Sequence, residues 1–209
     1  MLLSLVDAFR CPAAHEESPL VLSIDQRAGE RVQTGLLGCP ICHARYPILG
    51  GAVDFTGDGT GVRHAVSHEP VDSVRLAAQL GLSDPGGIVL LTGRYASVHS
   101  ALIDLADVTC LLMHSTVAPG QAAVSIDVGE RLPLGAGVLR GAAMDAPRGA
   151  PALLAEVVRC VRRGGRIVAT SGPPPPRGIR LLAADSLEWV GEVAEAGPMF
   201  ALRRASRPD

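Results

Sequence analysis

The sequence predicts an α/β protein: a small N-terminal β module is followed by a mostly parallel sheet with helices on both faces and a terminal antiparallel pair. Three observations lead to this fold class. Of the 209 residues, 47% are apolar and only 3% aromatic, which suffices for a packed core of aliphatic side chains. Short, wholly apolar runs alternate with segments of helical periodicity in the larger C-terminal part. Three of the five cysteines lie at positions 11, 39 and 42.

Two compositions meet near residues 56–70, where glycine and polar residues dominate. Such a stretch is typical of a linker. We therefore expect an N-terminal module at 1–55, a linker at 56–70 and a sheet domain at 71–209.

The elements of the sheet domain follow from hydrophobic periodicity. A stripe of Val71, Val74, Leu76, Ala77 and Leu80 predicts a helix that ends at Gly81. The expected elements after it are a strand at 87–92, a helix at 97–106, and strands at 108–113, 122–126 and 138–144. We expect the terminal antiparallel pair at 188–193 and 199–204.

The clearest helix opens at Pro151, because the apolar residues from Leu153 to Val161 share one face. Its expected last turn carries Arg159, Arg162 and Arg163, which are favourable beside the carbonyl end of a helix. Gly164 and Gly165 are expected to end it, before a strand at 166–170.

Charge and hydropathy exclude several kinds of partner. The formal net charge is −2 and the pI about 6.3, so no general field attracts nucleic acid. No uncharged stretch reaches the ~20 residues that cross a bilayer, and the N-terminus has no basic start or cleavage site of a signal peptide. We expect a cytoplasmic protein without disulfides, without a membrane and without a nucleic-acid partner.

The cysteine cluster predicts a metal site. Cys39-Pro-Ile-Cys42 is a C-x-x-C motif, whose two thiolates can reach one metal ion from a single tight turn. Cys11 and His15 can supply a thiolate and an imidazole from a second turn. Four such ligands satisfy tetrahedral zinc and leave no open position for chemistry. We expect a structural zinc ion held by Cys11, His15, Cys39 and Cys42.

Three stretches of this module carry a family resemblance: Leu-Val-Asp-Ala-Phe-Arg-Cys-Pro at 5–12, Gly-Cys-Pro-Ile-Cys at 38–42, and Tyr-Pro-Ile-Leu-Gly-Gly-Ala-Val-Asp-Phe at 46–55. They resemble the Trm112-like zinc-ribbon family. In that family a second cysteine of the first knuckle stands where this chain has Ala14. His15, one place later, would substitute for it.

Other interpretations of the cluster stay open. Cys42-His43 completes C-x-x-C-H, the haem attachment motif, but without an export signal the zinc interpretation is favoured. His43 is a fallback ligand in place of His15. A ribbon that has lost its metal and keeps its fold through a small core is the remaining alternative.

The larger part also carries a family resemblance. The stretch 153–168, with its Gly164-Gly165 turn, and the stretch 127–134, with Glu130-Arg-Leu-Pro133, resemble class I S-adenosylmethionine-dependent methyltransferases. The resemblance covers about residues 70–205 and implies a Rossmann-like fold. The fold class is then a zinc-ribbon-like β module followed by a Rossmann-like sheet.

The groups that hold the cofactor in that family are missing here. The turn after the first strand needs an acidic residue and three glycines, so that bare backbone can approach the cofactor. This chain keeps Gly93 but has Leu91, Tyr95 and Ser97 at the other positions. Residues 108–126 contain no carboxylate for the ribose, and His114 stands there instead. We expect a degenerate groove of Gly93, Tyr95, Ser97, His99 and His114, with no S-adenosylmethionine bound and no catalytic residue.

The two resemblances together predict a non-catalytic scaffold or regulatory protein. Trm112-like proteins generally bind and stabilise methyltransferases, so we expect a protein partner. A module of about 55 residues buries little apolar surface alone, so we expect it to dock on its own sheet domain. The alternatives are an active methyltransferase with a divergent cofactor site, acting on RNA or another substrate, and a small-molecule binder using the remodelled groove.

Overall fold

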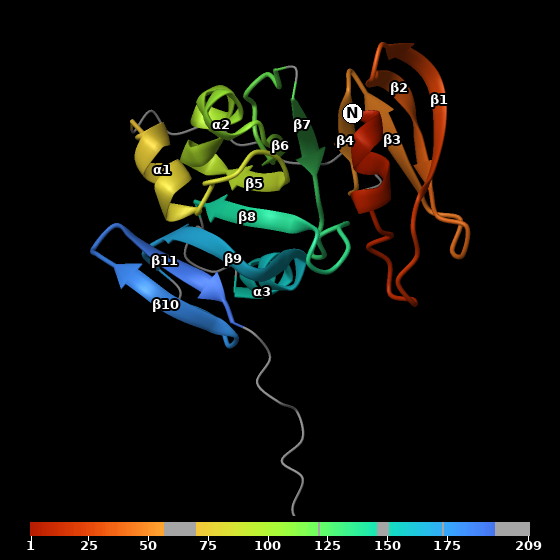
Figure 1. The fold of residues 1–209 in the computed structure, drawn as a ribbon. Coiled ribbons are helices and arrows are strands. Elements are labelled where there is room, and N and C mark those ends of the chain that lie inside the picture. The colour runs from red at the N-terminus through yellow and green to blue at the C-terminus, as the bar shows by residue number, and fades with distance from the viewer. Residues whose placement is uncertain (57–69, 121, 146–150, 173, 195–209) are drawn as a thin grey trace, which may run out of the picture.

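The strands that the structure describes form one mixed sheet (Figure 1). The computed structural model describes residues 1–56, 70–120, 122–145, 151–172 and 174–194. Within them the strands are β1 (Val21–Ala28), β2 (Arg31–Gly38), β3 (Arg45–Leu49), β4 (Ala52–Asp54), β5 (Ile88–Thr92), β6 (Thr109–Met113), β7 (Ala123–Asp127), β8 (Leu139–Met144), β9 (Val161–Thr170), β10 (Ile179–Ala184) and β11 (Glu188–Val193). Their order across the sheet is β1-β2-β3-β4-β7-β6-β5-β8-β9-β11-β10.

Five parallel strands, β7, β6, β5, β8 and β9, form the middle of the sheet. The chain builds from β5 toward β7 and then from β8 in the opposite direction, which is the strand order of a doubly wound fold. β7 and β8 are buried along their whole length, as expected for strands covered on both faces. The predicted Rossmann-like α/β class is confirmed. The point where the strand order reverses, here called the switch point, lies at the carboxyl ends of β5 and β8.

Helices cover both faces of the sheet (Figure 1). α1 (Ser73–Gln79) and α2 (His99–Ala106) bury Leu76 and Leu102 in one hydrophobic cluster, whereas α3 (Pro151–Cys160) buries Leu154 in the cluster on the opposite face. Short 3-10 helices, η1 (Leu3–Ala8) and η2 (Gly93–Val98), precede β1 and α2. The predicted stripe on the first helix was wrong at Val74, which is 64% exposed.

The helix that opens at Pro151 is shorter than its sequence pattern predicted. α3 ends at Cys160, and Val161 already pairs with Leu139 of β8, so the backbone has left the helix before the two glycines. The register then shifts, because Arg166 is the next residue of β9 in the ladder. Arg162 and Arg163 therefore lie in the strand, and the prediction that they occupy the last helical turn was wrong.

The terminal antiparallel pair exists, but with a different partner strand. β11 coincides with the predicted strand at 188–193, and it pairs with β10 and β9. The predicted partner at 199–204 lies outside the described residues. β10 gave no signal because Ile-Arg-Leu-Leu-Ala-Ala does not alternate, and as the last strand of the sheet it is largely exposed.

The N-terminal module joins this sheet edge to edge. Strands β1 to β4 are antiparallel to one another, and β4 pairs in parallel with β7, with Val53 opposite Ile126. A second contact is the isolated bridge between Phe9 and Leu134. We call these two contacts the seam. They make the strands of the module a continuation of the Rossmann-like sheet.

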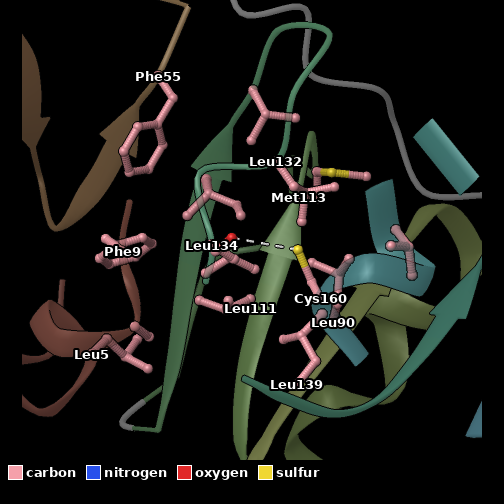
Figure 2. Packing of buried hydrophobic residues seen from close by; sticks show 14 of the residues in the cluster. Leu5, Phe9, Phe55, Leu90, Leu111, Met113, Leu132, Leu134, Leu139 and Cys160 are labelled. Atoms are coloured by element: carbon pink, nitrogen blue, oxygen red, sulfur yellow. Dashed lines mark hydrogen bonds between the residues drawn. The ribbon is translucent and has the colours of Figure 1, made fainter. Parts of the chain in front are cut away.

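One hydrophobic cluster runs through the seam (Figure 2). Phe9 and Phe55 of the module and Leu111 and Leu134 of the Rossmann-like part are all buried in it. Residues 57–69, most of the predicted linker, lie outside the described residues. Within the described residues the two parts thus share both a sheet and a core.

Candidate metal centre and cofactor groove

Three cysteines and a histidine of the N-terminal module come together at one point. Cys11 and His15 lie in the loop between η1 and β1, and Cys39 and Cys42 lie in the turn after β2. One ligand atom from each lies within 4.8 Å of those of the others. These are the four residues that the sequence singled out as zinc ligands. We call them the metal cluster.

Two of the distances within the metal cluster match those of a zinc site. The Sγ atoms of Cys11 and Cys42 are 3.7 Å apart, and Sγ of Cys39 is 3.4 Å from Nε2 of His15. Tetrahedral zinc, with bonds of about 2.3 Å to sulfur and about 2.0 Å to nitrogen, separates two sulfurs by about 3.8 Å and a sulfur and a nitrogen by about 3.5 Å. These two separations, and the chemistry of three sulfurs and one imidazole nitrogen, fit the metal that the motif predicts.

Backbone groups form hydrogen bonds with two of the ligands, Cys39 and His15, and favour the forms that bind a metal. The amides of Ile41 and Cys42 donate hydrogen bonds to the Cys39 sulfur. Burial raises the pKa of Cys39, but these amides and the neighbouring thiols lower it to about 6, so the thiolate that a metal requires is favoured. Nδ1 of His15 lies 2.6 Å from the carbonyl oxygen of Glu16, which leaves Nε2 free to face the cluster.

His43 is not part of the metal cluster. Its backbone adopts a left-handed conformation with φ of 60°, and its N–H donates to the carbonyl of Cys39, which closes the turn. This geometry favours His15 over the fallback ligand. The sulfurs of Cys39 and Cys42 both face Cys11 and His15, so the zinc interpretation accounts for them better than haem attachment does.

Tyr46 of β3 stands behind the metal cluster. Its hydroxyl lies 3.4 Å from the Cys11 sulfur, and burial raises the pKa of Tyr46 above its usual range, so the phenol stays protonated. Burial also raises the pKa of Cys11, which a hydrogen bond from Tyr46 opposes. This contact was not predicted, because nothing in the sequence pattern places Tyr46 beside Cys11.

The second candidate site is the switch point, where doubly wound folds bind their ligands. Gly93 follows β5 with φ of +52°, and a Cβ there would collide with the side chain of Asp145, directly after β8. Asp145 Oδ2 accepts the N–H of Arg94 at 3.3 Å, and Thr92 Oγ1 accepts the N–H of Asp145 at 2.9 Å. The ends of β5 and β8 are thus tied together by their own side chains.

Tyr95 is buried beside these hydrogen bonds between the ends of β5 and β8. The side chain is 1% exposed, and its hydroxyl donates to Glu188 at 2.9 Å. Glu188 also accepts hydrogen bonds from Arg75 at 2.8 Å and Gln79 at 2.7 Å, and Arg94 lies 3.5 Å away. The guanidinium of Arg94 stacks over the Tyr95 ring at 5.0 Å. The buried carboxylate of Glu188, at the start of β11, is therefore hydrogen-bonded to side chains of α1 and η2.

Two other predicted groove residues, Ser97 and His99, bond to nearby backbone carbonyls instead of lining the pocket. Ser97 is exposed, and its hydroxyl donates to the carbonyl of Arg94 at 2.6 Å. His99 is buried at the start of α2, with Nδ1 3.0 Å from the carbonyl oxygen of Ala96. Neither lines the pocket that Tyr95 borders.

His114 stands at the end of β6, where the resembled family places a carboxylate. Its φ is 51°, and Nδ1 lies 3.9 Å from Oδ1 of the buried Asp127, at the end of β7. A carboxylate is therefore present at this edge, but it comes from the next strand. In the sequence Asp127 served only as the first residue of the family-like stretch 127–134, and the carboxylate expected near the ribose was sought only within residues 108–126.

A pocket of about 170 Å³ opens at the carboxyl edge of the sheet, between α1, η2 and the start of β11. Arg75, Gln79, Arg94, Tyr95 and Glu188 line it. Its polar groups largely bind one another, as described above.

Among known proteins, similarity to this chain is found at the level of solved structures. No protein-family model and no curated protein matches the chain. Similar solved structures include the antibiotic-resistance methyltransferase Kmr (13% identity, 65% of this chain and 99% of that chain, TM-score 0.41). The tRNA (m1A58) methyltransferase TrmI from Aquifex aeolicus is 11% identical over 64% of this chain and 73% of that chain, with TM-score 0.45. A chain of the complex between the Haloferax volcanii Trm112 methyltransferase activator and a methyltransferase is 12% identical over 59% of this chain and 94% of that chain, with TM-score 0.43.

Among the described residues, none of the helices has the length and apolar character needed to span a membrane.

Proposed function

We propose that this chain is a non-catalytic scaffold or regulatory protein, whose ribbon is held by a structural zinc ion and whose Rossmann-like part does not bind S-adenosylmethionine. The observation that carries the proposal is the occupied switch point. The Tyr95 ring, the Asp145 carboxylate and the Glu188 hydrogen bonds take up the place where a nucleoside would need bare backbone. A cofactor site filled in this way supports a role without S-adenosylmethionine-dependent catalysis.

The metal part of the proposal rests on the donor set. Cys11, His15, Cys39 and Cys42 would hold the ion, which would supply cross-linking of two loops and no chemistry, because all four positions are taken by protein. The ribbon would then be rigid enough to present a fixed surface. Because β4 and Phe9 are engaged at the seam, a protein partner would bind elsewhere on the chain.

Isothermal titration of the full chain with S-adenosylmethionine tests the proposal. We expect no binding heat up to roughly millimolar ligand, which corresponds to an affinity weaker than about −4 kcal/mol. Micromolar binding would overturn the proposal and favour an active methyltransferase with a divergent cofactor site, acting on RNA or another substrate.

A small-molecule binder is the second candidate, and the pocket of about 170 Å³ favours it. Its position outside the carboxyl ends of the strands is where open α/β sheets take ligands. Crystals of the chain grown with a library of small metabolites would test it. A molecule ordered between Arg75 and Tyr95 would support this second function, and an unchanged pocket would leave the scaffold as the better account.

A further inference from the structure

Aromatic side chains are scarce in this chain, yet three of them form a continuous row. The whole sequence holds three Phe, two Tyr and one Trp. The ring of Tyr46 lies 5.2 Å from that of Phe55, and Phe55 lies 5.2 Å from Phe9, both pairs at 42°. Such tilted pairs stabilise beyond the area that they bury. The row extends from the metal cluster to the seam.

At one end of the row, the Tyr46 hydroxyl contacts a ligand of the metal cluster. The oxygen is 3.4 Å from the Cys11 sulfur, and Tyr46 is 5% exposed. Either atom can be the donor in the metal-free chain, but a thiolate that binds a metal ion can only accept, so with metal bound the hydrogen bond would run from Tyr46 to Cys11. The β2–β3 ladder, in which Tyr46 pairs with Leu37, fixes the position of the donor.

At the other end, the row meets the Rossmann-like part. The N–H of Phe55 donates to the carbonyl of Asp127 at 2.7 Å, and Phe9 bridges to Leu134. Figure 2 shows Phe9 and Phe55 facing Leu132 and Leu134 across the seam. A displacement of Cys11 would therefore shift Tyr46, and through the packed rings of Phe55 and Phe9 it would alter the packing at the seam.

We propose that Tyr46 is a positioning residue, which holds the Cys11 thiolate for the metal and couples metal occupancy to the order of the seam. The inference rests on the proposed structural zinc. It assigns Tyr46 a role that the four ligands alone do not explain. Hydrogen-bond partners of metal ligands commonly change metal affinity by 10–100-fold when they are removed.

Tyr46→Phe is the decisive variant, because it keeps the ring in the aromatic row and removes only the hydroxyl. Tyr95→Phe is the matched control, since Tyr95 is the other tyrosine, is also buried, and donates to Glu188 away from the metal cluster. Zinc affinity of the full-length chains is measured by competition with a chromophoric chelator. Cobalt(II) replaces zinc for the spectra, because thiolate-to-cobalt charge-transfer bands report the sulfur ligands.

We expect Tyr46→Phe to bind zinc about tenfold more weakly or worse, with a shifted charge-transfer band, while Tyr95→Phe matches the wild type. A Tyr46→Phe chain with wild-type affinity and spectrum overturns the inference and leaves the metal centre intact. A wild-type chain that takes up neither zinc nor cobalt overturns the proposed metal centre, and this inference with it.

Hydrogen exchange at the Phe55 amide tests the coupling to the seam. Removal of zinc by a chelator should speed exchange of this amide in the wild type, and by a smaller factor in Tyr46→Phe. Equal protection of the Phe55 amide with and without zinc would contradict the coupling, whatever the affinities are.

Discussion

At the scale of single residues, the arrangement around Glu188 decides what the groove can hold. A carboxylate that is 9% exposed must be hydrogen-bonded, and Tyr95, Arg75 and Gln79 supply the donors. A ligand that displaced the Tyr95 ring would break its hydrogen bond to Glu188. These hydrogen bonds hold the Tyr95 side chain in its place beside the switch point.

Removing the hydroxyl of Tyr95 should destabilise the fold measurably. In Tyr95→Phe the Glu188 carboxylate loses a donor while it stays buried, so we expect a loss of about 1–3 kcal/mol in urea unfolding. Ser97→Ala is the control, because the Ser97 hydroxyl is exposed, and its loss should stay within about 0.5 kcal/mol. Equal stabilities of the two variants would show that the Tyr95 hydrogen bond is not important.

Cys39→Ser should remove the metal and loosen the ribbon. The serine keeps the size of the side chain but is a poor zinc ligand, so we expect less than about 0.1 zinc per chain by elemental analysis, against about one in the wild type. Residues 1–55 should lose exchange protection before the Rossmann-like part does. Cys110→Ser, at a buried strand position outside the metal cluster, should keep its zinc.

The sequence could predict the metal cluster because its spacing is local. Two ligands in each of two short turns need no knowledge of the tertiary fold, and only the choice between His15 and His43 needed the backbone geometry. Glu188 and Asp145 carry no such signal. They reach the groove from strands far along the chain, so only the sheet order brings them to Tyr95.

At the scale of elements, α3 is fastened to the segment that carries the seam. Oε2 of Glu156 accepts the N–H of Leu132 at 3.2 Å, and Arg159 donates to the carbonyls of Leu132 and Leu134 at 3.1 and 2.9 Å. Leu134 is the residue that bridges to Phe9. The helix thus supports the seam from the Rossmann-like side.

This support should depend on pH. The hydrogen bond from Arg159 holds the pKa of Glu156 below its usual range, so the folded state binds the Glu156 proton more weakly than the unfolded state does. Its contribution is present above the unfolded value of about 4.3 and is lost as the pH falls through the lower folded value. Unfolding free energies at pH 7 and pH 3 should therefore differ less in Glu156→Gln than in the wild type. An identical difference in both proteins would contradict this linkage.

The parallel strands were predictable as elements, but the seam was not. β5 and β6 are short, largely apolar runs that their own composition indicates, whereas β7 and β8 carry a weaker signal because they include Ser125, Asp127 and Arg140. β4 has only three residues, and its parallel pairing with β7 depends on where the whole module lies. The small size of the module predicts docking, but no residue pattern indicates that it docks on a sheet edge.

At the scale of the whole molecule, the two parts are joined by backbone pairing and by one core. Cleavage within residues 57–69 should therefore leave the two fragments associated. We expect limited proteolysis followed by native gel filtration to give both fragments in one peak near the intact mass. Clean separation, with a soluble free ribbon, would mean that the module is available to an outside enzyme instead.

Truncating the aromatic row should weaken the whole molecule. Phe55 is buried between Tyr46 and Phe9, so Phe55→Ala leaves a cavity at the seam and should cost about 3–5 kcal/mol in unfolding free energy. Leu49→Ala is the control on the same module, since Leu49 is 67% exposed and should cost little. A small loss in Phe55→Ala would show that the shared core is not the main connection between the parts.

Native mass spectrometry of the full chain, purified without added metal and then mixed with about millimolar S-adenosylmethionine, tests the central claim most directly. The account predicts a single species, the chain with one zinc ion and no nucleoside, because the metal cluster is complete and the switch point is filled. A specific nucleoside adduct, or a folded chain without zinc, would contradict it.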